Sequence, residues 1–183
     1  MAITINGTSN TITGLAVGGV PDGTIDTDAL AAGAVTAAKR GTDGILEIVS
    51  GTTTTELDST STSYVDTGLT ATITTTGSNK VLVLVNQVIR AHYQGSGAAS
   101  SSMKLLRDST GIVEIGYVPT VRAQFNSGYL GGGDSAAIVY LDSPGSGGTY
   151  VYKVQAKRAS DGDQFYCQYD SGRSNIILME IAA

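Results

Sequence analysis

The chain contains one histidine, His92, and one cysteine, Cys167, and these two residues limit the chemistry that it can do. A Ser-His-Asp hydrolase would have to use His92, but no Gly-x-Ser-x-Gly motif accompanies it at a strand-to-helix turn. One Cys and one His are too few for a zinc site of the usual kind. We therefore expect no catalytic residues, no cofactor and no metal, with His92 at a strand end or in a loop.

The carboxylates do not form a convincing pair for glycan cleavage, which needs an acid and a base or nucleophile at a set distance. Most of them fall in expected turns, at Asp108, Asp134, Asp142, Asp161 and Asp163. The Asp-Gly-Asp run at 161 to 163 predicts a turn, because the longer pattern of a calcium loop is missing. A polysaccharide depolymerase is thus the enzyme alternative, and we expect no enzyme.

Three clusters at expected turns and strand ends combine aromatic rings with planar polar groups. Sugars are held by such mixtures, because their C–H faces stack on rings while their hydroxyls bond amides, carboxylates or guanidinium groups. The candidate receptor-binding residues are His92, Tyr93 and Gln94; Arg122, Gln124, Phe125, Asn126 and Tyr129; and Tyr169, Asp170 and Arg173. The tyrosines have a second interpretation, which is packing in the core or between subunits with a satisfied hydroxyl.

Composition favours extended structure. Only 15% of residues are charged, and Thr, Val, Ile and Tyr, which pack well on a pleated surface, are common. The net charge of −5 and the absence of a basic block argue against nucleic-acid binding. The longest apolar stretch, Val81 to Val85, is far shorter than a membrane helix, so no membrane insertion is expected. Met1 is followed by no secretory signal pattern, which predicts synthesis in a cytoplasm.

The elements that must position these residues are short strands separated by turns, from about Ile45 onward. Val81 to Val85 is apolar on both faces and predicts a central strand that is covered on both sides. Cys167 is expected as a small buried hydrophobe, and Tyr150 and Tyr152 share one face that packs inside. Further strands are expected at 46–49, 64–73, 102–107, 112–118, 136–141, 149–156, 165–169 and 175–181, with loops at 95–97, 108–111, 131–134, 143–148 and 161–163. This pattern predicts an all-β fold, an antiparallel β-sandwich, with jelly-roll topology.

The residues before Gly44 differ in composition and predict a separate N-terminal segment. Ile3 to Gly14 has two short alternating runs around a turn, as in a hairpin. The run from Gly23 to Leu30 is echoed ten residues later from Gly33 to Arg40. Each unit has too few large apolar side chains to fold alone. Either this segment is a disordered linker, or identical chains form a thin neck in which Ile25, Leu30 and Val35 face a shared axis.

Three stretches resemble short bacteriophage tail fibre proteins. They are Ile3 to Thr8 followed by Ile12 to Leu15; Gly18 to Ile25 running into Leu30 to Val35; and Ser59 to Leu69 with Asn79 to Val85, together with the closing Ile177 to Ile181. These stretches occur at the beginning, middle and end of the chain, and their order is more specific than any one of them.

The resemblance implies a homotrimer in the virion tail, made in the host cytoplasm. Residues 1–43 would attach to other tail or baseplate proteins and form the trimeric neck. Residues 44–183 would form a β-sandwich head, similar to the trimeric jelly rolls of tumour-necrosis-factor-like proteins, that binds a bacterial surface glycan or protein. The alternative is a purely structural head fibre or baseplate component without receptor binding.

Overall fold

The computed structural model describes residues 4–6, 8, 11–13, 44–94, 97–123, 129–159 and 163–182. Contacts divide the chain into two units, Met1–Gly41 and Thr42–Ala183. In the first unit, β1 (Thr4–Asn6) and β2 (Thr11–Thr13) pair as the antiparallel hairpin that the sequence predicts. Ile25, Leu30 and Val35 lie outside the described residues, so the trimeric neck stays a prediction.

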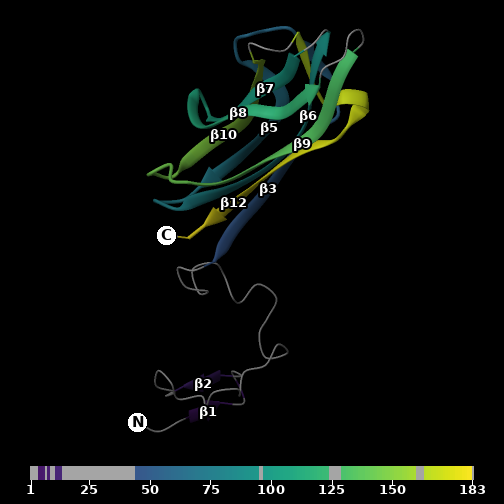
Figure 1. Cartoon of the computed structure of the whole chain (residues 1–183). Coiled ribbons are helices and arrows are strands. Elements are labelled where there is room, and N and C mark those ends of the chain that lie inside the picture. The colour runs from purple at the N-terminus through teal and green to yellow at the C-terminus, as the bar shows by residue number, and fades with distance from the viewer. Residues whose placement is uncertain are drawn as a thin grey trace. The chain divides into compact units, whose positions relative to one another are not determined.

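The second unit is an antiparallel β-sandwich, as the sequence predicts (Figure 1). Its strands are β3 (Ile45–Thr53), β4 (Leu57–Ser59), β5 (Val65–Thr75), β6 (Lys80–Gln94), β7 (Gly97–Arg107), β8 (Thr110–Ala123), β9 (Tyr129–Asp142), β10 (Gly148–Arg158), β11 (Gln164–Cys167) and β12 (Ser174–Ile181). A short 3-10 helix, η2 (Tyr169–Ser171), lies between β11 and β12. β-branched and aromatic residues in these segments favour the extended backbone.

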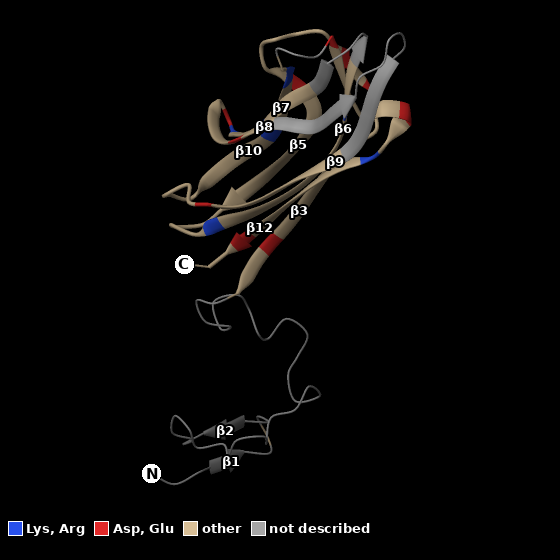
Figure 2. Cartoon of the chain, viewed as in Figure 1, with Lys and Arg blue, Asp and Glu red and all other residues tan. Residues whose placement is uncertain are grey.

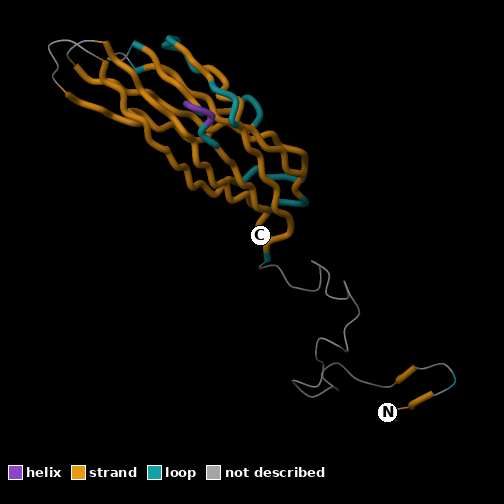
Figure 3. Tube along the Cα trace, turned by 90° about the vertical axis from the view of Figure 1, so that its right-hand side faces the viewer, coloured by secondary structure: helices purple, strands orange, loops and turns teal. Residues whose placement is uncertain are grey.

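The two sheets lie face to face, as the trace in Figure 3 shows. One sheet has the order β5-β10-β7-β8. The other is built around β6, the longest strand, which pairs with β9 along the whole of one edge. On its other edge β6 pairs first with β12 and then with β11, and these two strands are flanked by β3 and β4. We call this second sheet the β6 sheet.

The core lies between the sheets and follows from alternation along each strand. Leu69, Ala71 and Ile73 of β5 are buried, and their neighbours in sequence are exposed. The largest fully buried side chains are those of Tyr152 and Phe165. Burial of Cys167 confirms the prediction made for it, and burial raises the pKa of this thiol to about 12.

The structure corrects two expectations. The glycines at 131–133 were predicted as a loop but lie in β9, where they pair with residues 90–92 of β6. The long neighbouring strand β6 offers hydrogen-bond partners to the backbone groups on one edge of this segment, and this outweighs the weak strand preference of glycine. Val81 to Val85 is a central strand as predicted, but Leu82 and Leu84 face outward and are only half-buried, with no second layer over them among the described residues.

Candidate binding site

Four aromatic and cationic side chains meet on the outward face of the β6 sheet, toward the C-terminal end of β6. Arg90 and His92 are two residues apart, so both leave the strand on the outward side, and β11 places Tyr166 opposite Arg90. The Tyr166 ring meets the Tyr169 ring edge-on at 5.4 Å and the His92 ring at 6.4 Å. Arg90 Cζ lies 4.3 Å from the centroid of the Tyr169 ring. We call these four residues the Tyr166 cluster.

A turn in an unusual backbone conformation carries Tyr169 into this cluster. Three non-glycine residues around it have left-handed φ angles, namely Gln168 (54°), Asp170 (53°) and Ser171 (59°). Each such residue costs about 1–2 kcal/mol, so contacts elsewhere must hold the turn in place. One is the hydrogen bond that the Gln168 N–H donates to the Val88 carbonyl at 3.0 Å. The position of Tyr169 is therefore imposed by the fold.

Buried polar side chains beneath this turn hold it in place. We call them the buried polar network, and its members Thr67, Gln87, Gln168 and Ser174 are all nearly or fully buried. The Ser174 hydroxyl accepts hydrogen bonds from Gln87 Nε2 at 3.0 Å and from the Val88 N–H at 2.9 Å. The Gln168 amide is satisfied at both ends when its oxygen faces Ser174 Oγ (2.9 Å) and Gln87 Nε2 (2.6 Å). Fully satisfied buried networks fix one arrangement of the chain, because an unpaired buried polar group is costly.

Carboxylates line one side of the Tyr166 cluster. Glu56 Oε2 accepts a hydrogen bond from the Asp170 N–H at 3.0 Å, and Asp58 accepts one from the Gln164 side chain. Burial raises the pKa of Tyr166, and the negative charge of Asp58 raises it further. The Tyr166 hydroxyl thus stays protonated at neutral pH and keeps its capacity to donate a hydrogen bond.

This arrangement is suited to holding a polar ligand with an apolar face. Tyr169 is 42% exposed, and the part of its ring that Arg90 does not cover offers a stacking surface. Guanidinium, amide and carboxylate groups beside it supply donors and acceptors in fixed positions. No group of three or more His, Cys, Asp or Glu within the described ranges is placed to hold a metal ion.

The structure brings together some of the residues predicted for receptor binding. His92 and Tyr169 belong to the Tyr166 cluster, and Asp170 follows Tyr169 in η2. The backbone pairing of Gln94 with Tyr129 places both at the same end of the β6 sheet as His92. Tyr93 precedes Gln94 in β6, Arg122 lies near the end of β8, and Arg173 is an exposed residue just before β12. The side chains of Tyr93, Gln94, Arg122 and Tyr129, and the whole of Gln124, Phe125 and Asn126, lie outside the described part.

Sequence reasoning missed Arg90, Tyr166 and the two carboxylates Glu56 and Asp58. Arg90 carried a usable signal, because it lies two residues before His92 in an alternating strand. Tyr166 and the carboxylates join the site through the pairing of β11 with β6 and β4, which links positions more than 70 residues apart. No local pattern in the sequence reports that pairing.

A second exposed group of polar and aromatic side chains surrounds Tyr64 on the outward side of the other sheet, and neighbouring side chains of the same chain cover the Tyr64 ring. Lys104 Nζ and Lys157 Nζ lie 4.1 and 4.4 Å from the centroid of the Tyr64 ring. The Tyr64 hydroxyl donates a hydrogen bond to Glu114 Oε1 at 2.7 Å. Because two ammonium groups cover this ring, it offers less stacking surface than Tyr169 does.

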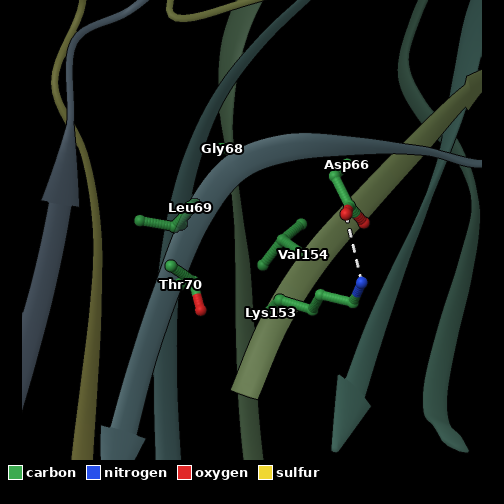
Figure 4. A pocket seen from close by; sticks show the side chains of 6 residues that line it. All are labelled: Asp66, Gly68, Leu69, Thr70, Lys153 and Val154. Carbon is green, nitrogen blue, oxygen red and sulfur yellow. Dashed lines mark hydrogen bonds and ion pairs between the residues drawn. The ribbon is translucent and has the colours of Figure 1, made fainter. Parts of the chain in front are cut away.

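A hollow of about 260 Å³ lies on the same sheet (Figure 4). Its lining includes Lys153 and Val154, where the register of β10 against β5 shifts. Lys153 Nζ lies 3.1 Å from Asp66 Oδ2, and Gln155 Nε2 donates to Asp66 Oδ1 at 2.7 Å. Burial acts to raise the pKa of Asp66, but these two partners outweigh it and lower the pKa. The carboxylate is therefore paired and charged, and it is a poor general acid.

Comparison with known proteins gives matches among solved structures but none by sequence. No protein-family model and no curated protein sequence matches the chain. A chain in the structure of infectious bursal disease virus Gx strain aligns with 10% identity and a TM-score of 0.31, over 75% of this chain and 37% of that chain. A chain of infectious bursal virus derived T=1 particles aligns with 15% identity and a TM-score of 0.30, over 77% and 38%. This chain thus spans less than two fifths of the length of those chains.

No helix within the described ranges is both long enough and apolar enough to span a membrane.

Proposed function

We propose that this chain is a structural virion protein of the tail fibre kind, whose β-sandwich binds a glycan or protein on the bacterial surface. In this proposal the N-terminal segment attaches to other tail or baseplate proteins, and three copies form one fibre. The strand order, with β3-β12-β6-β9 opposite β5-β10-β7-β8, is that expected of a double-sheet jelly roll and supports the proposed head. The order of the fibre-like sequence stretches supports the virion location.

The observation that carries receptor binding is the exposed Tyr169 ring in the Tyr166 cluster. A tyrosine held in a left-handed turn, with a guanidinium over its face and carboxylates beside it, is positioned at a cost in backbone energy. The buried polar network that supports this turn fixes the ring without filling its exposed side. Rigid aromatic groups of this kind bind with a small loss of conformational entropy.

The test is binding of the purified full-length chain to a panel of bacteria, with inhibition of infection as a second readout. We expect Tyr169→Ala to weaken binding at least tenfold, because it removes the stacking surface. Tyr64→Ala is the matched control, since Tyr64 lies on the other sheet with both lysines on its ring. Loss of binding to periodate-treated cells but not to protease-treated cells would identify a glycan receptor.

Wild-type protein that binds no cells and blocks no infection would refute the receptor-binding part. The chain would then be the purely structural head fibre or baseplate component, which keeps the fold and the trimer. Equal binding by Tyr169→Ala and wild type would instead move the receptor site away from the Tyr166 cluster. Release of sugars from purified surface glycan would contradict the proposal that the protein is not an enzyme.

A further inference from the structure

The outward face of the β6 sheet carries apolar side chains in register across four strands. One row runs from Ile48 of β3 through Met179 and Leu82 to Leu141 of β9. The next row runs through Ile177 and Leu84 to Val139, beginning at Ser50. Ile181 pairs with Ile45 in the row before. We call these nine residues the apolar face: Ile45, Ile48, Leu82, Leu84, Val139, Leu141, Ile177, Met179 and Ile181.

The opposite outer face of the sandwich has a different composition. Apart from Gly68, the outward positions of β5 and β10 are hydroxyl-bearing, amide or charged, with one exposed aliphatic residue, Val151. They are Asp66, Thr70, Thr72, Thr74, Thr149, Val151, Lys153, Gln155 and Lys157. A sandwich that is solvated on both sides carries polar residues on both outer faces. This sandwich carries polar residues on the outer side of β5 and β10 and apolar ones on the outer side of the β6 sheet, so the apolar face is suited to being covered.

The exposure and the area of the apolar face indicate how large an interface it could form. Val139 is 73% exposed and Ile48 is 59% exposed, the highest values among the large apolar residues described. Four strands across and about five residues along give a flat area of roughly 300 Å² from the standard spacings. Each partner in a standard interface contributes about 800 Å², so this face has the size of the central, desolvated part of such an interface.

Charge indicates which partner fits. The two rows that cross all four strands, and the next row of Thr52, Asn175, Asn86 and Ala137, contain no Lys, Arg, Asp or Glu, whereas in the end row Ile181 pairs with Lys80 of β6. Figure 2 shows charged residues of β3, β12 and β6 toward the strand ends, beside this uncharged middle. Copies of a chain with net charge −5 repel one another wherever their charges meet, and least across an uncharged surface. An oppositely charged foreign partner would find no complementary charge here.

We propose that the apolar face is the surface through which copies of this chain associate. The inference deepens the homotrimer of the proposed function by naming its interface, and it does not depend on receptor binding. The Tyr166 cluster lies beyond the row of Asn86, further along β6, so the two surfaces are separate. Interfaces between identical chains are more apolar than those of transient complexes, as this face requires.

Thiol labelling tests this in the full-length wild-type fold. Ser50→Cys puts a small probe in a row of the apolar face, and Thr72→Cys puts a matched probe on the opposite outer face. Both positions are exposed in the single chain and lie in mid-strand. Cys167 gives little background, because it is buried and its thiol pKa is raised. We expect maleimide to modify Ser50→Cys at least tenfold more slowly than Thr72→Cys, and equal rates would overturn the proposal.

A charge placed on the face supplies the second test. Val139→Lys puts an ammonium at a side chain that is already largely exposed, so the single chain should keep its fold, as checked by circular dichroism. We expect its sedimentation to shift to the mass of one chain, while Val151→Lys on the opposite face keeps the wild-type mass. A folded Val139→Lys variant with wild-type mass would refute the interface, and so would a wild-type protein that sediments as one chain. Failure to bind cells would leave these outcomes unchanged, so the two proposals fail separately.

Discussion

Ser174 is the centre of the buried polar network, and its replacement by alanine should be costly. The change removes one hydroxyl and leaves the β-carbon, so it creates almost no cavity. Three hydrogen bonds are lost, to Gln87 Nε2, to the Val88 N–H and to the Gln168 amide. Gln87 keeps the Val88 carbonyl and the Gln168 oxygen as acceptors. The Val88 N–H has no other partner among the described contacts.

The magnitude follows from these losses. A hydrogen bond contributes about 0.5–1.5 kcal/mol net, and a buried donor left without a partner costs about 1–3 kcal/mol. We therefore expect Ser174→Ala to lower the free energy of unfolding by about 2–4 kcal/mol. Because the network holds the turn that carries Tyr169, the variant should also bind cells more weakly than its loss of stability alone explains.

Urea unfolding, monitored by circular dichroism, measures this change in the free energy of unfolding. All variants are compared at one chain concentration, because association is linked to folding. Ser78→Ala, in the exposed turn between β5 and β6, is the matched control and should change stability by less than about 0.5 kcal/mol. If Ser174→Ala also stays within about 0.5 kcal/mol of wild type, the network does not hold the turn, and the account of how Tyr169 is positioned is wrong.

Three further predictions concern other buried groups. Burial acts to raise the pKa of Glu180, but hydrogen bonds from Asn79 and Thr76 outweigh it and hold the pKa below its ordinary value of 4.5. This carboxylate therefore stabilises the fold above pH 4.5, and the stabilisation is lost as the pH falls through the lowered pKa of the folded state. The melting temperature of Glu180→Gln should thus fall less than that of wild type in acid. Melting temperatures that fall equally in both proteins would contradict this. Gly51→Ala should lose at least about 2 kcal/mol in urea unfolding, because its β-carbon would clash with the Thr70 carbonyl oxygen. Gly116→Ala meets nothing within 4 Å and should lose under about 1 kcal/mol. Tyr152→Phe should lose about 1.5–3 kcal/mol, because its buried hydroxyl donates to Asp142 Oδ2 at 2.7 Å, and Tyr150→Phe, whose hydroxyl bonds the exposed Ser146, should lose less.

Local patterns predicted much of the sandwich. Alternation in Leu69, Ala71 and Ile73 marks the buried side of β5, and the apolar run around Val83 marks the central strand. Both signals come from side chains within one strand, which a single sequence contains in full. Strand ends were less well predicted, since β6 and β9 continue through glycine and polar residues once they pair with each other.

Only part of the candidate site was predicted, because some of its residues are neighbours in sequence and others meet only in the folded chain. His92 and Tyr169 were named because ring and polar groups lie together in sequence there. Arg90 and Tyr166 meet them through the pairing of β6 with β11, which depends on the whole fold. The polar network was not predicted, because Gln87 and Ser174 have surface-like residue types and become core residues only when both sheets close over them.

The central claim is that this sandwich works as one copy in a homotrimeric structural assembly. Native mass spectrometry of the wild-type chain tests it most directly. We expect a species of about 56 kDa, three times the chain mass of 18.7 kDa, that persists at micromolar concentration. A single species at the mass of one chain would contradict it.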